Sequence, residues 1–79
     1  MKKRLADFVV GEAGQVLGFN KGTAHYRQKL LAMGLVKGTE FRVVWVAPMG
    51  DPVEIRVRDF SLSLRKEEAK ALQVKEIAQ

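Results

Sequence analysis

The sequence predicts a mainly β fold, a small and partly open barrel of about five short strands with one inserted α-helix and a second, short helix. Runs rich in Val, Ile, Leu and Phe alternate with polar residues, which is the period of half-buried strands. Clusters of Gly, Pro, Asn and Asp separate these runs and indicate turns. With 79 residues, the chain has room for one domain, which we expect to span residues 1–79.

The first third of the chain is predicted to form a strand and a helix. We expect the strand over 14–19, with a bend at Gly18, because glycine inside a strand often marks a bulge. The inserted helix is expected over about 23–33, with Thr23 as its N-cap and Gly34 as the left-handed residue that ends it. Its apolar stripe consists of Tyr26, Leu30 and Met33, with Leu31 beside them.

The next strand, 40–47, is apolar on both faces, so it is either a central strand or has one face covered by something outside the domain. Strict alternation would place Phe41, Val43 and Trp45 on one face and Arg42, Val44 and Val46 on the other.

The remaining elements are shorter. We expect strands over 53–57, 60–64 and 73–77, and a short helix near 65–71 whose acidic residues precede its lysine, as the helix dipole favours. Residues 5–12 should close the core through Leu5, Phe8, Val9 and Val10.

The connection between 40–47 and 53–57 is the candidate contact site. Two prolines bracket Gly and Asp there, so the hairpin tip should be stiff and lose little entropy on binding. The partner-binding residues that we expect are Tyr26, Arg27, Trp45, Pro48, Met49, Gly50, Asp51 and Pro52. Met49 would be an apolar anchor at the apex. Trp45 is either an exposed interface anchor, forming an aromatic surface with Tyr26, or a core residue, and the sequence leaves both open.

Reactive chemistry is sparse in this chain. There are no cysteines, and His25 is the one histidine, so we expect no metal site and no cofactor. Met1, Met33 and Met49 are not spaced as a soft-metal cluster, and Asp51 with Glu54 would offer too few oxygens for a hard cation. No histidine is placed to activate Ser61 or Ser63, and no glycine-rich phosphate loop exists. We therefore expect a protein that is not an enzyme and binds no nucleotide itself.

The formal charge of +5 favours acidic partners, and a small basic barrel that binds nucleic acid, or a transcription-regulator module, is the alternative function. Part of the surplus is the terminal run Lys2, Lys3 and Arg4. Acidic residues are interspersed among the bases, which disfavours a nucleic-acid stripe: Glu40, Asp51, Glu54, Glu67 and Glu68. No apolar run has the roughly 18 residues of a membrane span, so we expect a cytoplasmic protein.

Four segments, in order and spacing, resemble the FeoA family of ferrous-iron transport proteins. They are the run from Tyr26 to Leu35, Gly38-Thr39, the run from Ala47 to Pro52, and the run from Leu64 to Ala69. The resemblance implies an SH3-like barrel, kinship with the C-terminal domain of DtxR-type repressors, and a cytoplasmic accessory of the FeoB GTPase-permease at the inner face of the membrane. The chain departs from the family pattern at Lys37, where proline is frequent, and at Arg58-Asp59, where a turn with glycine is frequent.

The implied partner raises two further hypotheses. An arginine supplied in trans could assist GTP hydrolysis by FeoB, although ordinary surface arginines are the interpretation that we favour. The arginines considered are Arg27, Arg42, Arg56, Arg58 and Arg65. An exposed strand edge of the open barrel gives a second contact route, self-association.

Overall fold

The computed structural model describes residues 4–77 as one antiparallel sheet with helices at its margins. The strand order is β4-β3-β2-β1-β5, and the prediction of a mainly β fold with two helices is confirmed. The strands are β1 (Ala13–Phe19), β2 (Glu40–Val46), β3 (Val53–Val57), β4 (Phe60–Leu64) and β5 (Leu72–Ile77). The helices are the 3-10 turn η1 (Leu5–Asp7), α1 (Ala24–Ala32) and α2 (Lys66–Ala71). Met1, Lys2 and Lys3 lie outside the described residues.

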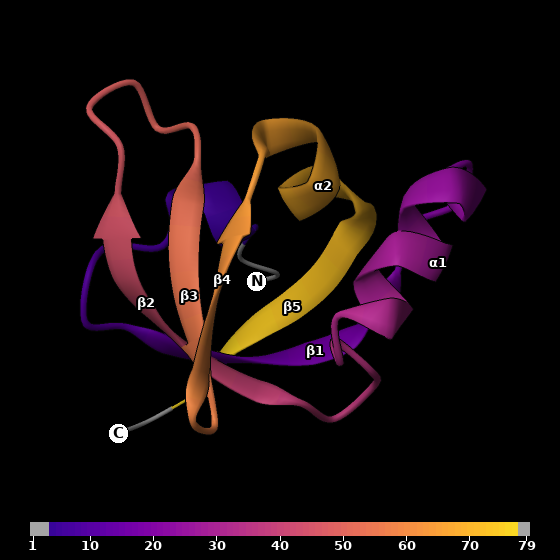
Figure 1. The fold of residues 1–79 in the computed structure, drawn as a ribbon, viewed down its shortest axis with the longest axis horizontal. Coiled ribbons are helices and arrows are strands. Elements are labelled where there is room, and N and C mark those ends of the chain that lie inside the picture. The colour runs from indigo at the N-terminus through magenta and orange to yellow at the C-terminus, as the bar shows by residue number, and fades with distance from the viewer. Residues whose placement is uncertain (1–3, 78–79) are drawn as a thin grey trace.

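The strands curve around a shared interior, and α2 links the upper ends of β4 and β5 while α1 lies to one side (Figure 1). β2 is the middle strand of the order, which is the first of the two alternatives that its apolar faces left open. Gly18 does lie at an irregularity, because the β1–β5 register shifts between Val16 and Gly18. None of the described helices is long and apolar enough to cross a membrane.

The core lies on the inner face of this curved sheet. It consists of Leu5, Phe8, Val16, Leu30, Leu35, Phe41, Val43, Val53, Ile55, Val57, Leu64, Ala69, Ala71, Leu72 and Val74. The rings of Phe8 and Phe41 lie 5.6 Å apart between centroids, over Gly14, where a Cβ would approach the Phe41 ring to 2.5 Å. The expectation that Val9 and Val10 close the core is wrong: both are exposed, because the chain turns there before it enters β1.

Helix α1 is anchored to the core by Leu30, which is fully buried, while Tyr26 and Met33 pack against the core half-buried and Leu31 is exposed. The expected N-cap bond is absent, because the Thr23 hydroxyl donates to the Asn20 carbonyl instead of accepting from the helix. The C-terminal prediction is confirmed. Gly34 has a φ of +91°, and the Leu35 N–H donates to the Leu30 carbonyl at 3.0 Å, which closes a Schellman motif.

Strand β2 does not keep strict alternation. Its register with β3 shifts between Val43, which pairs with Ile55, and Trp45, which pairs with Glu54. The extra residue, Val44, forms a bulge that reverses the direction of the next side chain. Trp45 therefore leaves the face of Phe41 and Val43, and the prediction that the three share a face is wrong.

Helix α2 is held by Glu68, whose carboxylate is buried at 5% exposure. One oxygen accepts from the Arg65 backbone N–H at 3.0 Å, and the other pairs with the Lys29 ammonium of α1. The hydrogen bond from Lys29 lowers the pKa of Glu68 below its ordinary value, although burial opposes this effect, and the Arg65 N–H adds to the lowering. The ion pair joins α1 to α2.

Replacement of Leu30 tests the placement of the α1 stripe. Leu30→Ala should reduce the free energy of unfolding by about 2–5 kcal/mol, because it leaves a cavity at a position with 0% exposure. Leu31→Ala is the matched control, one residue further along the same helix but exposed, and should cost less than about 1 kcal/mol. Urea denaturation measures both, and equal costs would contradict the placement.

Replacement of Glu68 tests the ion pair. Because the folded-state pKa is lowered, the stabilisation is present above the ordinary carboxyl pKa and is lost as the pH falls through the folded-state pKa. Glu68→Gln should therefore destabilise the protein by about 1–2 kcal/mol at pH 7, and the difference from wild type should shrink below about pH 4.

Chemical denaturation of both proteins between pH 7 and pH 3 measures this difference. Glu67→Gln, which removes an exposed carboxylate from the same helical turn, should change stability by no more than about 0.5 kcal/mol at pH 7. A Glu68→Gln deficit that persists undiminished at pH 3 would refute the role assigned to the ion pair.

Candidate functional site

The hairpin tip between β2 and β3 projects from the top of the sheet (Figure 1). Two backbone hydrogen bonds organise it: the Ala47 N–H donates to the Pro52 carbonyl at 3.0 Å, and the Gly50 N–H donates to the Ala47 carbonyl at 2.7 Å. Met49 stands at the apex with 92% of its surface exposed. The tip is thus a structured loop that presents a large apolar side chain to solvent.

Asp51 fastens the tip to helix α2. One of its carboxylate oxygens accepts from the Lys66 backbone N–H, the first of the helix, at 3.0 Å. A carboxylate at this end of a helix satisfies an otherwise unpaired donor and complements the helix dipole. The structure therefore gives Asp51 an internal structural contact, while its role in partner binding stays a prediction.

Trp45 lies on the outer face of the sheet at the base of the tip, with 48% of its surface exposed. Its cross-strand neighbour is Glu54, and the next outward residue across the sheet is Ser63. Of the two positions that the sequence left open for Trp45, the structure selects the exposed one. Trp45 and Met49 thus place two large apolar groups on one hairpin.

Tyr26 and Arg27 lie elsewhere, on α1, which Figure 1 shows at the opposite side of the molecule from the end of β2. Tyr26 stacks with His25 at 4.1 Å between ring centroids and packs against the core. Arg27 lies over the Phe19 ring, 5.6 Å from its centroid. The hypothesis that Tyr26 and Trp45 form one aromatic surface is therefore wrong, because the sheet separates them.

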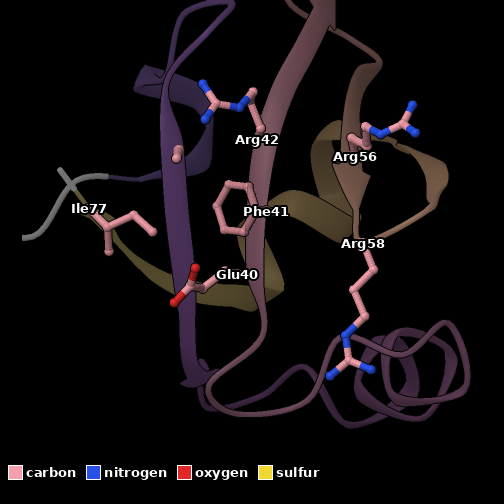
Figure 2. A pocket seen from close by; sticks show the side chains of 7 residues that line it. Glu40, Phe41, Arg42, Arg56, Arg58 and Ile77 are labelled. Carbon is pink, nitrogen blue, oxygen red and sulfur yellow. The ribbon is translucent and has the colours of Figure 1, made fainter. Parts of the chain in front are cut away.

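Three arginines line a shallow depression on the outer face of the sheet, with a volume of about 310 Å³ (Figure 2). Arg42 and Arg56 are direct cross-strand partners, and Arg58 is in the following turn with a φ of 55°. Their guanidinium groups point apart, and Arg42 donates to the Gly11 carbonyl at 2.8 Å. The remaining lining residues are Ala13, Glu40, Phe41 and Ile77.

A second cavity, of about 480 Å³, lies between η1, α2 and the hairpin tip. Its lining contains both apolar side chains and three cationic ones. The apolar residues include Leu5, Val53, Ala69 and Leu72, and the cationic ones are Arg4, Lys66 and Lys70. Because Gly50 of the tip also lines it, this cavity adjoins the surface that Met49 presents.

The described residues show no cluster of metal-ligating side chains. Within residues 4–77, no group of three His, Cys, Asp or Glu residues could hold a metal ion. Ser61 and Ser63 lie exposed on the outer face of β4, as their alternation predicted.

Sequence reasoning missed the arginine depression and the Lys29–Glu68 link. Arg42 and Arg56 are 14 positions apart in the chain, and only the β2–β3 register makes them neighbours. A signal was present, since both occupy outward positions of strands joined by one hairpin. For Lys29 and Glu68 there was no comparable signal, because the two helices are not adjacent in sequence.

A family model described as "FeoA domain" matches residues 3–76. A curated relative from Porphyromonas gingivalis, "Fe(2+) transport protein A/Fe(2+) transporter FeoB fusion protein", is 35% identical over 75 residues. That match covers 95% of this chain but only 9% of the relative's length.

Solved structures agree with the family match. An FeoA-like protein from Clostridium acetobutylicum is 38% identical, with a TM-score of 0.86 over 100% of this chain and 92% of that one. IdeR from T. acidophilum has a TM-score of 0.84 at 18% identity, over 96% of this chain and 34% of that one, which shows a shared fold alone. This shared fold confirms the expected SH3-like barrel and its structural likeness to IdeR. From the family match and these relatives together, the chain belongs to the FeoA domain family.

Proposed function

We propose that this protein is a small accessory of ferrous-iron uptake that binds a FeoB-type GTPase-permease, at the inner face of the membrane, and modulates or assembles it by protein–protein contact. The observation that carries the proposal is Met49, which is 92% exposed on a hydrogen-bonded hairpin tip. A single exposed apolar side chain is common on protein surfaces, but Met49 shares its hairpin with the exposed Trp45, and apolar groups that lie together on a surface mark interaction sites.

The P. gingivalis relative supports the identity of the partner. Its description joins an Fe(2+) transport protein A and a FeoB transporter in one polypeptide. A covalent link keeps two modules at a high effective concentration, which favours contact between them. A separate chain of the same family would need to achieve this contact through its own surface.

The tip is suited to such contact because little of it must become ordered on binding. Its turn hydrogen bonds and the bond from the Lys66 N–H to Asp51 are already made in the free protein. Trp45 adds an aromatic group at the base of the tip, and aromatic residues are enriched among the residues that dominate binding energy. The proposed contact surface is therefore Trp45 and the tip from Pro48 to Pro52.

An arginine that acts in trans on the partner's GTP is a weaker hypothesis. Arg42, Arg56 and Arg58 share one depression, but their guanidinium groups diverge, whereas stabilising a phosphoryl group requires convergent donors. We therefore propose binding by the tip, and leave GTP hydrolysis to the partner's own residues.

Nucleic-acid binding is the second candidate, and the cross-strand pair of Arg42 and Arg56 favours it. Acidic side chains lie on the same outer face, with Glu40 in the depression and Glu54 opposite Trp45. A mixed face binds phosphate backbones poorly. Steeply salt-dependent binding to duplex or single-stranded nucleic acid would support this candidate against the first.

A pull-down tests the proposed partner. The full chain, immobilised as bait, should retain the intact FeoB-type permease of the same organism from detergent solution or nanodiscs. The nucleotide-free, GDP-bound and GTP-analogue-bound permease should be tested separately, because a GTPase domain presents different surfaces in these states. Absence of retention in all three states would overturn the proposal.

Replacement of Met49 tests the surface. Met49→Asp should weaken binding of the permease by at least about tenfold, because it places a charge at the centre of an apolar contact. Thermal unfolding should remain within about 2 °C of wild type, because the side chain is 92% exposed. Titration calorimetry or surface plasmon resonance with the reconstituted permease measures the affinity.

Val36→Asp is the matched control. Val36 is also apolar and exposed, at 47%, but lies in the loop between α1 and β2, at the opposite end of the sheet from the tip (Figure 1). It should leave the affinity unchanged. Equal losses for Val36→Asp and Met49→Asp would show that general acidification, rather than the tip, governs binding.

A further inference from the structure

Strand β4 is an edge strand without the usual protection. It pairs with β3 on one side, and no other strand of residues 4–77 pairs with its other side. Its sequence, Phe-Ser-Leu-Ser-Leu, contains neither a charged residue nor a proline. Natural edges are normally blunted by such residues, by a bulge or by a cover. The β3–β4 register, in contrast to that of β2–β3, shows no irregularity.

The other edge of the sheet is protected. β5 carries Lys75 and Glu76 within the strand, and both are exposed. In addition, η1 packs against β5, whereas α2 contacts β4 and β5 alike. The difference between the two edges indicates that β4, rather than β5, is available for pairing.

The hairpin geometry defines which backbone groups of β4 are available. Arg58 and Asp59 form a two-residue turn, so the flanking pair Val57 and Phe60 is hydrogen-bonded. By alternation, Leu62 and Leu64 also direct their N–H and C=O groups toward β3. Ser61 and Ser63 therefore direct theirs toward the open edge.

These groups are self-complementary. We propose that β4 pairs antiparallel with β4 of a second copy about a two-fold axis at Leu62, which joins two sheets into one. In this register Ser61 of each copy lies opposite Ser63 of the other. Each copy therefore donates two backbone N–H groups, and two of its carbonyl groups accept hydrogen bonds. A shift of the axis to Ser61 or Ser63 would pair one serine with itself and leave the other against a turn or a helix start.

The side chains agree with the same register. Leu62 would lie beside its own copy, and Phe60, which is 42% exposed, would lie beside the other copy's Leu64 on the inner face. At the ends of the strand, Asp59 of one chain would lie opposite Arg65 of the other, so opposite charges meet. Because β4 itself is uncharged, no like charges oppose one another along it. These complementarities favour a second copy over an acidic or a basic foreign strand.

Amide exchange gives the most direct test. In the full chain, protection of the Ser61 and Ser63 N–H groups should rise with protein concentration between about 10 µM and 1 mM. Leu62 and Leu64 should be protected at every concentration, because their N–H groups already bind β3. Sedimentation equilibrium should show a mass approaching twice the 8.9 kDa of one chain over the same range.

Two variants test the edge. Ser63→Pro removes an N–H that points away from β3, and should raise the dimer dissociation constant by about tenfold or more. Ser63→Thr retains the N–H, and should leave the constant within about threefold. Circular dichroism verifies that both variants are folded.

A charge exchange tests the register. Asp59→Arg should weaken the dimer, because it sets two arginines opposite each other at both ends of the pair. The double variant Asp59→Arg with Arg65→Asp should restore it. If the protein is monomeric at 1 mM, if the serine amides exchange freely at that concentration, or if the double variant is as weak as the single one, the proposed pairing is wrong. Binding of the permease by the Met49 tip is measured separately and does not depend on this outcome.

Discussion

The first turn of α2 is the point on which the arrangement of this molecule depends. Three segments that are remote in sequence meet there: the hairpin tip through Asp51, α1 through Lys29, and the helix itself through the Glu68 carboxylate and the Arg65 N–H. Each contact uses a charge-assisted hydrogen bond, the stronger class of such bonds. The junction adds to the burial of Leu30, which anchors α1 to the core, and to the backbone hydrogen bonds that organise the tip.

This junction would give the proposed contact surface a fixed shape before it binds. A flexible loop in this place would have to become ordered in each binding event. Because Asp51 is bonded to the Lys66 N–H, the tip is already ordered, and Met49 is presented in one place. Lys66 and Lys70 line the cavity beside the tip.

Most of the fold was predictable because local signals determined it. The Pro48–Pro52 tip, the alternation in 53–57, and Gly34 at the end of α1 each specify a structure from a few adjacent residues. Features that depend on distant residues were not predictable. Thr23 lost its capping role to the Asn20 carbonyl, and the pairing of Arg42 with Arg56 required a register that no local pattern contains. Of the candidate site, the tip was predicted as a unit, but its grouping with Tyr26 was not correct.

The bulge at Val44 determines which face of the sheet carries Trp45. Side chains along a strand alternate between two faces. Adding or removing one residue therefore moves every later side chain of the strand to the opposite face. Trp45 is displayed because one additional residue precedes it in β2. Loss of a single codon at this position would exchange a solvent-facing tryptophan for an inward one, and the proposed contact surface would change without the substitution of any amino acid.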